Sequence, residues 1–399
     1  MKSSTHTPSA APWQEAWLRF RSDTPACAAL VMLLLLWIAA MAAPLLANPR
    51  PLVEYTPQQG LQLPFLRCFF APESTEFCIE QLFNYLLLAT VILPVVHWLL
   101  HRCSRRIRYS AAAVIMLLLL LPFLFTKPKL ERVDYRSGQA AQGTIRIMAP
   151  LPYGPFEQIG APFAPPSAQH WLGCDELGRD LAVRLIYGSR ISLAVGLLAT
   201  TLAMLLGLVI GIFSGFRGGW FDIIIMRLVE IFMCFPVFLL LLIIMAFFQE
   251  YKFEQSILAV IGVIAATGWI GMAQLARGEV FKQREMVYVK AAQSLGISQS
   301  GIIFRHILPN MLGVVLITFS FGVAGAILSE SALSFLGFGV QPPTASWGGM
   351  LRAAFGDPLH AWHLTIFPGL MLFWAVAGFN LLGEGLRKAF DPRTSINKG

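Results

Sequence analysis

Long runs of apolar residues alternate with short polar segments along the chain. Eight runs with few or no charges can be marked, at 26–46, 82–100, 110–125, 191–213, 228–248, 256–275, 311–329 and 364–382. A helix needs about 20 apolar residues to cross the hydrocarbon core of a bilayer. The pattern therefore predicts an all-α membrane protein with about eight transmembrane helices, of which 110–125 is the shortest.

The composition agrees with a membrane protein. Hydrophobic residues make up 56% of the chain and charged residues 13%, whereas a soluble domain carries about 25% charged residues. The first run is longer than the apolar part of a cleaved signal peptide, and a polar segment of 25 residues precedes it. We therefore expect 26–46 to be retained as the first transmembrane helix.

The net charge of +8 follows the topology of the predicted helices. With the N-terminus in the cytoplasm, the segments on the inner side hold 18 of the 30 Lys and Arg residues, although these segments are shorter in total than the outer ones. This is the positive-inside pattern. It predicts a multi-pass protein of the bacterial inner membrane with both termini in the cytoplasm, and it accounts for the basic charge without nucleic-acid binding.

A Pro- and Gly-rich segment separates two parts of the chain. Residues 1–126 form an N-terminal region with three predicted helices, and 127–185 form an extracytoplasmic segment. Residues 186–390 form a second set of helices, followed by a tail at 391–399. Within the second set, Gly207, Gly211 and Gly215 recur every four residues, a spacing that allows close helix packing in lipid.

The six cysteines do not have the spacing of a zinc site. Cys68 and Cys78 lie in a predicted outer segment, where a disulfide between them is possible. Free thiols in both positions are the alternative.

The longest inner loop, 276–310, carries the most specific pattern. Its residues predict a helix over 277–295 that ends at Gly296, a residue suited to the left-handed conformation. Ser298 or Ser300 could cap a second short helix, which Pro309 is expected to close. Taken alone, this is an ordinary helical hairpin at the membrane surface.

The sequence of this loop resembles that of a known protein family. Ala291 and Ala292, then Gly296, then Leu308 and Pro309 after Ile307, resemble the cytoplasmic sequence of ABC importer permeases. Three further stretches resemble the C-type permeases of dipeptide, oligopeptide and nickel importers. They are HWLGCDELGRDLAVRLIYGSRISLAVGL, SALSFLGFGVQPPTASWGGML and NLLGEGLRKAFDPR, which begin at 170, 331 and 380.

This resemblance implies a fold, partners and contacts. The fold is the five-helix core of a type I ABC importer permease within 186–390. The partners are a second permease subunit, two ATP-binding-cassette ATPases, an extracytoplasmic solute-binding protein and the lipid bilayer. The expected ATPase contacts are Lys290, Ala291, Ala292, Gly296, Leu308 and Pro309. Such a permease would form the translocation pore of a peptide importer and couple it to ATP hydrolysis.

The chain departs from the family pattern in two ways. The signature usually opens with a glutamate where this chain has Lys290, so an acidic partner on the ATPase is possible, or the contact is dispensable. Members of this branch typically have one helix before the five-helix core, whereas three are predicted here. The extra pair is 82–100 and 110–125.

The sequence lacks GxxxxGK[ST], HExxH and GxSxG. We therefore expect no enzymatic activity and no cofactor in this chain, with ATP bound by the partner ATPases. The alternative is a secondary transporter driven by an ion gradient, which would favour charged residues at the bilayer midplane. Glu330 is predicted at a span end, where its side chain could reach water, and Asp222 is expected to pair with Arg227.

An acidic and basic cluster lies just before the second set of helices. It consists of Asp175, Gly178, Arg179 and Asp180 in the sequence DELGRD. The cluster could be a docking surface for a binding protein. Alternatively, Arg179 could form an internal salt bridge that fixes the loop.

Overall fold

The computed structural model describes residues 12–58, 60–70, 74, 76–125, 135–136, 144–250 and 256–390. Within these ranges, seven helical spans are long and apolar enough to cross a membrane, and a bent helix pair could form an eighth. The fold class predicted from the sequence is thus confirmed. The spans are α2 (Thr24–Met41), α5 (Phe77–Leu99), α6 (Arg105–Phe125), α7 (Leu181–Arg217), α10 (Ser256–Arg284), Gln299–Leu336 and α15 (Trp362–Phe390).

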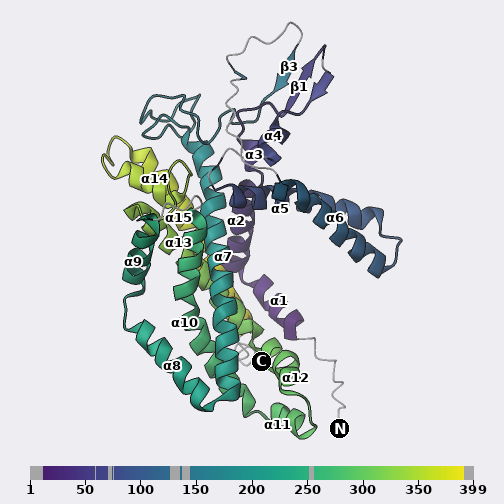
Figure 1. Ribbon diagram of the computed structural model, residues 1–399. Coiled ribbons are helices and arrows are strands. Elements are labelled where there is room, and N and C mark those ends of the chain that lie inside the picture. The colour runs from purple at the N-terminus through teal and green to yellow at the C-terminus, as the bar shows by residue number, and fades with distance from the viewer. Residues whose placement is uncertain are drawn as a thin grey trace.

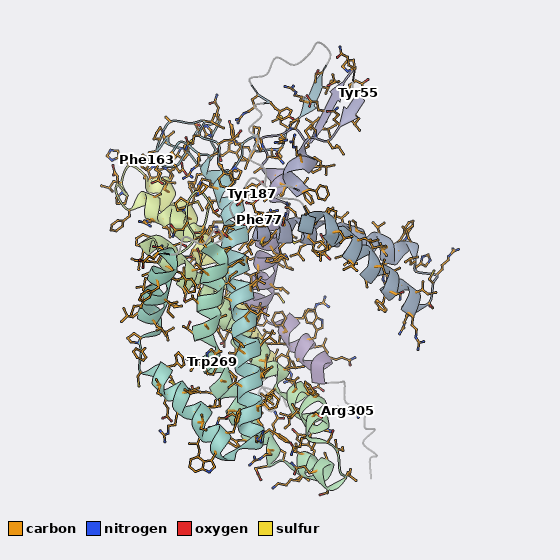
Figure 2. All side chains as sticks on the ribbon, viewed as in Figure 1. Tyr55, Phe77, Phe163, Tyr187, Trp269 and Arg305 are labelled. Carbon is orange, nitrogen blue, oxygen red and sulfur yellow. The ribbon has the colours of Figure 1, made fainter. Side chains whose placement is uncertain are left out.

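The longest single helices form one bundle around α7 (Figure 1). α10 packs along α7, and α13 (Leu308–Leu336), α15 and α2 complete the bundle. A Cβ atom at Gly207 would clash with the carbonyl oxygen of Trp269 on α10, a residue labelled in Figure 2, and a Cβ atom at Gly211 would clash with that of Ala273. The glycine spacing in the sequence therefore serves the close packing of α7 against α10.

The predicted span 228–248 is wrong as a single straight helix. α8 (Gly219–Met233) and α9 (Val237–Glu250) meet at an angle of 83°. Pro236 lies in the break; proline has no N–H to donate, and it disfavours the helical conformation of the residue before it. In Figure 1, α8 and α9 lie beside α10 as two limbs of a bent element.

α5 and α6 form a hairpin that leaves the bundle sideways (Figure 1). α5 packs against α2 and α7, and α6 packs against α5. The carboxylate of Glu76, just before α5, accepts hydrogen bonds from the Ser256 hydroxyl at 2.7 Å and the Ile257 N–H at 3.2 Å. Glu76 thus joins the base of the hairpin to the first turn of α10, and burial there raises its pKa.

The remaining elements lie at the two ends of the bundle. α14 (Trp347–Ala354), the short helices α3 (Ala43–Leu46) and α4 (Phe65–Phe70), and a small antiparallel sheet lie at one end, called the α14 end. The sheet has the order β2-β1-β3, from Gly60–Gln62, Val53–Thr56 and Ile145–Ile147; it was not predicted. α11 (Val287–Ser294) and α12 (Gln299–Ile302) lie at the opposite, α11 end, and α1 (Pro12–Ser22) packs on α15.

Candidate functional site

The α11 end is built by a change of chain direction after α10. The predicted continuous helix over 277–295 is wrong, because α10 ends at Arg284 and α11 begins at Val287. Met286 between them has an extended backbone, with φ −70° and ψ 145°. Neither glycine nor proline occurs at this break, so the sequence carries no local signal for it.

The predicted end of α11 is confirmed. Gly296 has φ +74°, its N–H donates to the Gln293 carbonyl, and the Ile297 N–H donates to the Ala292 carbonyl at 3.1 Å. This pair of hydrogen bonds is the Schellman arrangement, in which glycine avoids the cost of a left-handed Cβ. The Ser298 hydroxyl then caps α12 by accepting from the Gly301 N–H at 3.3 Å.

Pro309 does not close the second helix, contrary to the prediction. A π-helical segment, η1 (Ile303–Ile307), connects α12 directly to α13, and Pro309 lies in the first turn of α13. Proline lacks an N–H, so the first turn is the position in a helix where it is tolerated. Leu308 begins α13, and both residues therefore belong to the continuous span Gln299–Leu336.

α11 has one buried face and one exposed face. Val289 and Ala292 are buried in a core cluster with Ile302, Ile307 and residues of α10. Val287 and Leu295 are 83% and 80% exposed, and Lys290, Ala291 and Gly296 are exposed as well. Ala292 thus contributes to the internal packing of the loop, and the exposed apolar surface is carried by Val287 and Leu295.

Lys290 has an acidic partner within its own chain. Its Nζ lies 3.0 Å from a carboxylate oxygen of Glu285, and both side chains are more than half exposed. The hydrogen bond from Lys290 lowers the pKa of Glu285. An acidic residue on another subunit is therefore not required to neutralise Lys290.

A partly buried ion pair connects three helices near the α11 end. The guanidinium of Arg277 on α10 donates to both carboxylate oxygens of Asp222 on α8, at 2.5 and 2.6 Å. The Ser214 hydroxyl of α7 donates to the same carboxylate. The predicted pairing of Asp222 with Arg227 is wrong, because Arg227 pairs with Glu230 at 2.5 Å. Bidentate pairs of this kind are geometrically specific.

At the α14 end, the DELGRD cluster lies inside the protein. Asp175, Arg179 and Asp180 are buried, and Arg179 Nε lies 2.6 Å from Asp175 Oδ2. A second guanidinium, that of Arg184, lies 3.1 Å from the same oxygen. Of the two interpretations, this geometry favours the internal salt bridge that fixes the loop.

The other two residues of the cluster complete this loop. Gly178 has φ +73°, and a Cβ there would clash with the Gly160 carbonyl. Asp180 caps α7 by accepting from the Val183 N–H at 3.0 Å, and its second oxygen lies 2.8 Å from His170 Nδ1. The loop and α7 are therefore one structural unit, in which the helix begins at Leu181.

Buried polar groups within the bundle were not anticipated from the sequence. Glu330 does not reach water, because α13 continues to Leu336 and leaves its carboxylate fully buried. The hydroxyls of Ser192 and Ser334 donate to it at 3.0 and 2.7 Å. Arg190 of α7 is also fully buried and donates to the carbonyls of Ala40 and Met41 at the end of α2. These bonds tie α2 and α13 to α7.

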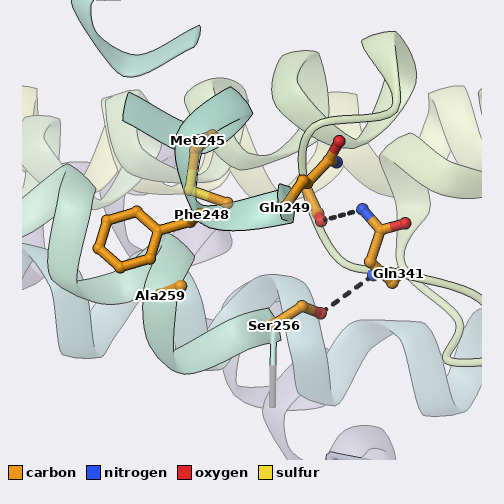
Figure 3. Close-up of a pocket in the computed structure, with 7 residues that line it drawn as sticks. Met245, Phe248, Gln249, Ser256, Ala259 and Gln341 are labelled. Atoms are coloured by element: carbon orange, nitrogen blue, oxygen red, sulfur yellow. Dashed lines mark hydrogen bonds between the residues drawn. The ribbon is translucent and has the colours of Figure 1, made fainter. Parts of the chain in front are cut away.

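A cavity of about 340 Å³ opens near the α14 end, between α9, α10 and the segment after α13 (Figure 3). Gln341 donates to the Gly337 and Gly339 carbonyls, and Gln249 donates to the Gly337 carbonyl at 2.6 Å. The Ser256 hydroxyl accepts from the Gln341 N–H at 3.1 Å. Neutral amide and hydroxyl groups therefore supply the polar atoms of this cavity.

The predicted disulfide stays a prediction. Cys78 is a free, half-buried thiol, and the side chain of Cys68 lies outside the described residues. Within the described residues, no group of three His, Cys, Asp or Glu side chains is placed to hold a metal ion.

Comparison with known proteins accounts for this architecture. Residues 207–396 match the family described as binding-protein-dependent transport system inner membrane component. Residues 11–64 match the N-terminal transmembrane domain of oligopeptide transport permease C. The chain is 40% identical to the glutathione transport system permease protein GsiD of Pectobacterium atrosepticum, over 57% of the chain and 74% of that protein.

The chain belongs to the permease family of binding-protein-dependent transport systems. Two further relatives come from Bacillus subtilis: the oligopeptide transport system permease protein OppC is 41% identical, and the dipeptide transport system permease protein DppC is 39% identical. The aligned parts cover 57% of the permease in both comparisons, and 73% and 70% of the two relatives. The resemblance inferred from the sequence is thus confirmed, as are the C-type branch and the multi-pass membrane class.

Membership in this family assigns the chain a role in transport across the membrane. The permease function fits these findings better than a secondary transporter driven by an ion gradient. The buried charged groups Glu330 and Arg190 are engaged with hydroxyls and carbonyls of neighbouring helices, which is a structural arrangement.

Proposed function

We propose that this permease imports small peptides as part of an ATP-driven complex. The peptide class is supported by relatives that are named for glutathione, oligopeptide and dipeptide transport. The complex would contain a second permease, two ATPase subunits that bind ATP, and a solute-binding protein. The α11 end would face the cytoplasm and the α14 end the outer side.

The observation that carries the coupling role is the exposed apolar surface of α11. Val287 and Leu295 extend from a short helix whose opposite face is anchored by Val289 and Ala292. A well-packed helix with exposed apolar side chains at its ends suits insertion into a groove of another protein. A force applied to α11 would pass to α10 through the shared core cluster, and to α13 through the continuous helix Gln299–Leu336.

The proposed mechanism needs no covalent chemistry in this chain. Binding and hydrolysis of ATP by the partner subunits would change the spacing of their grooves. The two permeases would then exchange inward-open and outward-open packings, and the bound nucleotide would favour one of them. Each α11 would carry that bias to its own helical bundle.

The test uses the permease co-expressed with its ATPase subunits. Replacing both Val287 and Leu295 by Asp should abolish ATPase co-purification and peptide-stimulated ATP hydrolysis. Each buried apolar side chain of this size contributes about 1.5–3 kcal/mol, so binding should weaken by at least tenfold. Leu295→Met retains an apolar side chain of similar size and should retain coupling.

Ala292→Trp is a poorer test of contact, because Ala292 is packed inside the loop and the substitution would displace α11 itself. If the double Asp variant still co-purifies with the ATPases and transports peptide at the wild-type rate, α11 is not the transmission element.

A further inference from the structure

A second cavity is bordered by α7, α9, α10 and α13 and has a volume of about 250 Å³. Small residues and hydroxyl-bearing residues form most of its walls. The hydroxyls belong to Thr200, Thr267, Thr318 and Ser329, one or more from each of three helices. Leu241 of this cavity and Met245 of the cavity in Figure 3 are one turn apart on α9, so the two cavities follow one another along it.

Three of the four hydroxyls donate to their own helix. Thr267 bonds the Val263 carbonyl at 3.0 Å, Thr318 the Val314 carbonyl at 2.9 Å, and Ser329 the Gly325 carbonyl at 2.9 Å. A hydroxyl that donates in this way keeps lone pairs that can accept from an N–H. These three positions therefore present acceptors toward the cavity.

Thr200 differs from the other three. Its side chain is 95% buried, and its Oγ1 has no hydrogen-bond partner within the described residues. Burying a hydroxyl without a hydrogen-bond partner destabilises the folded protein, because the hydroxyl loses its hydrogen bonds to water and gains none in return. The Thr200 hydroxyl is free to donate to a carbonyl oxygen, which complements the acceptors at the other positions.

The walls of this cavity include no Asp, Glu, Lys, Arg or His among the described residues that form it. A third groove, between α2 and α15, has walls of apolar residues such as Leu36 and Trp374, as expected of a surface in contact with lipid. In the second cavity, Gly322 leaves space beside Thr200, because a Cβ atom at Gly322 would lie 2.8 Å from Thr200 Cγ2. The hydroxyl-bearing cavity is thus distinct in chemistry from the lipid-type groove.

We infer that this cavity receives the backbone of a peptide as it passes through the permease, by hydrogen bonds that are independent of side-chain charge. The inference rests on the proposed peptide-import function. A peptide backbone carries one N–H donor and one C=O acceptor at each residue other than proline, and the cavity offers the complementary groups. Because its walls are uncharged, acidic and basic peptides encounter the same surface.

The experiment measures uptake of labelled Ala-Ala-Ala, Ala-Lys-Ala and Ala-Glu-Ala by the full complex in proteoliposomes. Thr200→Val has nearly the same shape but removes the hydroxyl, so uptake of all three peptides should fall about fivefold, the effect of one lost hydrogen bond. Thr200→Ser should restore uptake. Thr201→Val is the matched control, since Thr201 is exposed, lies outside the cavity and bonds the Leu197 carbonyl.

Thr200→Asp tests whether residue 200 contacts the peptide. If Thr200 had only a structural role, this substitution would not change the ratio of acidic to basic peptide uptake. Its carboxylate should lower the uptake of Ala-Glu-Ala relative to Ala-Lys-Ala by at least fivefold compared with the wild-type ratio. Unchanged uptake in Thr200→Val, or an unchanged ratio in an assembled Thr200→Asp complex, would overturn the inference while peptide import stands. If the wild-type complex hydrolyses ATP but imports none of the three peptides, the proposed function itself fails.

Discussion

The carboxylate of Asp175 neutralises two buried guanidiniums at the α14 end. Arg179 and Arg184 both lie within 3.1 Å of one of its oxygens. Its other oxygen accepts from the Leu177 and Arg179 N–H groups, each at 2.9 Å. A side chain with so many partners fixes the geometry of the loop that leads into α7.

Removing this charge should strongly destabilise the permease. Asp175→Asn removes the close, buried counter-charge of two buried cations, and breaking a buried ion pair typically costs about 3–5 kcal/mol. The midpoint of thermal aggregation of the purified complex should therefore fall by several degrees. Glu176→Gln is the matched control, because the Glu176 side chain is 45% exposed and its carboxylate is 4.0 Å from Arg179, which makes this a weak ion pair. Equal midpoints for the two variants would contradict the assigned role of Asp175.

Two cysteines of the chain should differ sharply in reactivity. Burial, assisted by the nearby negative charges of Asp180 and Asp175, raises the pKa of the Cys174 thiol to about 11. The thiolate is the reactive form, so Cys174 should resist alkylation by iodoacetamide at pH 8 in the native protein. Cys103 is exposed and should be modified within minutes.

The sign of the pH effect follows from the raised pKa. Because the folded protein holds this proton more tightly than the unfolded chain, the stability that this thiol contributes is fully present below pH 9 and declines as the pH rises from about 9 to about 11. Above about pH 11 both states have lost the proton and this contribution stays constant, and Cys174→Ala should remove this part of the loss. Rapid labelling of Cys174 at pH 8 would show that the outer loop opens in the native state.

At the scale of elements, the contact between α7 and α10 depends on glycine. Gly211→Ala forces a Cβ against the Ala273 carbonyl and the Ala276 side chain, and the two helices must separate to accommodate it. Overpacking of this kind costs about 1–3 kcal/mol. The expected result is a lower yield of assembled complex by size-exclusion chromatography.

Gly262→Ala on α10 provides the comparison. A Cβ at Gly262 meets nothing within 4 Å, and alanine has the higher helix propensity. This variant should therefore assemble at least as well as the wild type. Normal assembly of Gly211→Ala would mean that the α7–α10 contact tolerates a wider spacing.

The elements predicted from the sequence were those encoded by long apolar runs and by residues with special backbone requirements. Gly296 was predicted correctly, and Ser298 was one of the two predicted N-caps, because a left-handed helix end and an N-cap leave local signals. The break at Met286 and the π-helical segment before Pro309 have no local sequence signal. They are formed by residues without special backbone requirements, and tertiary packing determines their conformation. Thr200 and Glu330 could not be recognised either, because their neighbours come from other helices.

At the scale of the whole molecule, the asymmetry of Lys and Arg predicts an orientation and a number of crossings that reporter fusions can measure. Reporter fusions after Arg106 and at Asn397 should both report the cytoplasm if the charge asymmetry sets the topology. The first fusion tests the α5–α6 hairpin, which leaves the bundle sideways in Figure 1. An external signal at Arg106 combined with an internal signal at Asn397 would mean that the hairpin does not cross the membrane as two spans.

The length of α7 has a mechanical consequence. Its 37 residues extend for about 55 Å, far beyond a hydrocarbon core of about 30 Å. Asp180 fixes its first turn, and Ser214 connects its last turns to the Asp222–Arg277 pair. A rigid lever of this length that pivots about one end by 5° moves its other end by roughly 5 Å. A small rotation of α7 at one membrane surface is therefore enough to alter the width of an opening at the other surface.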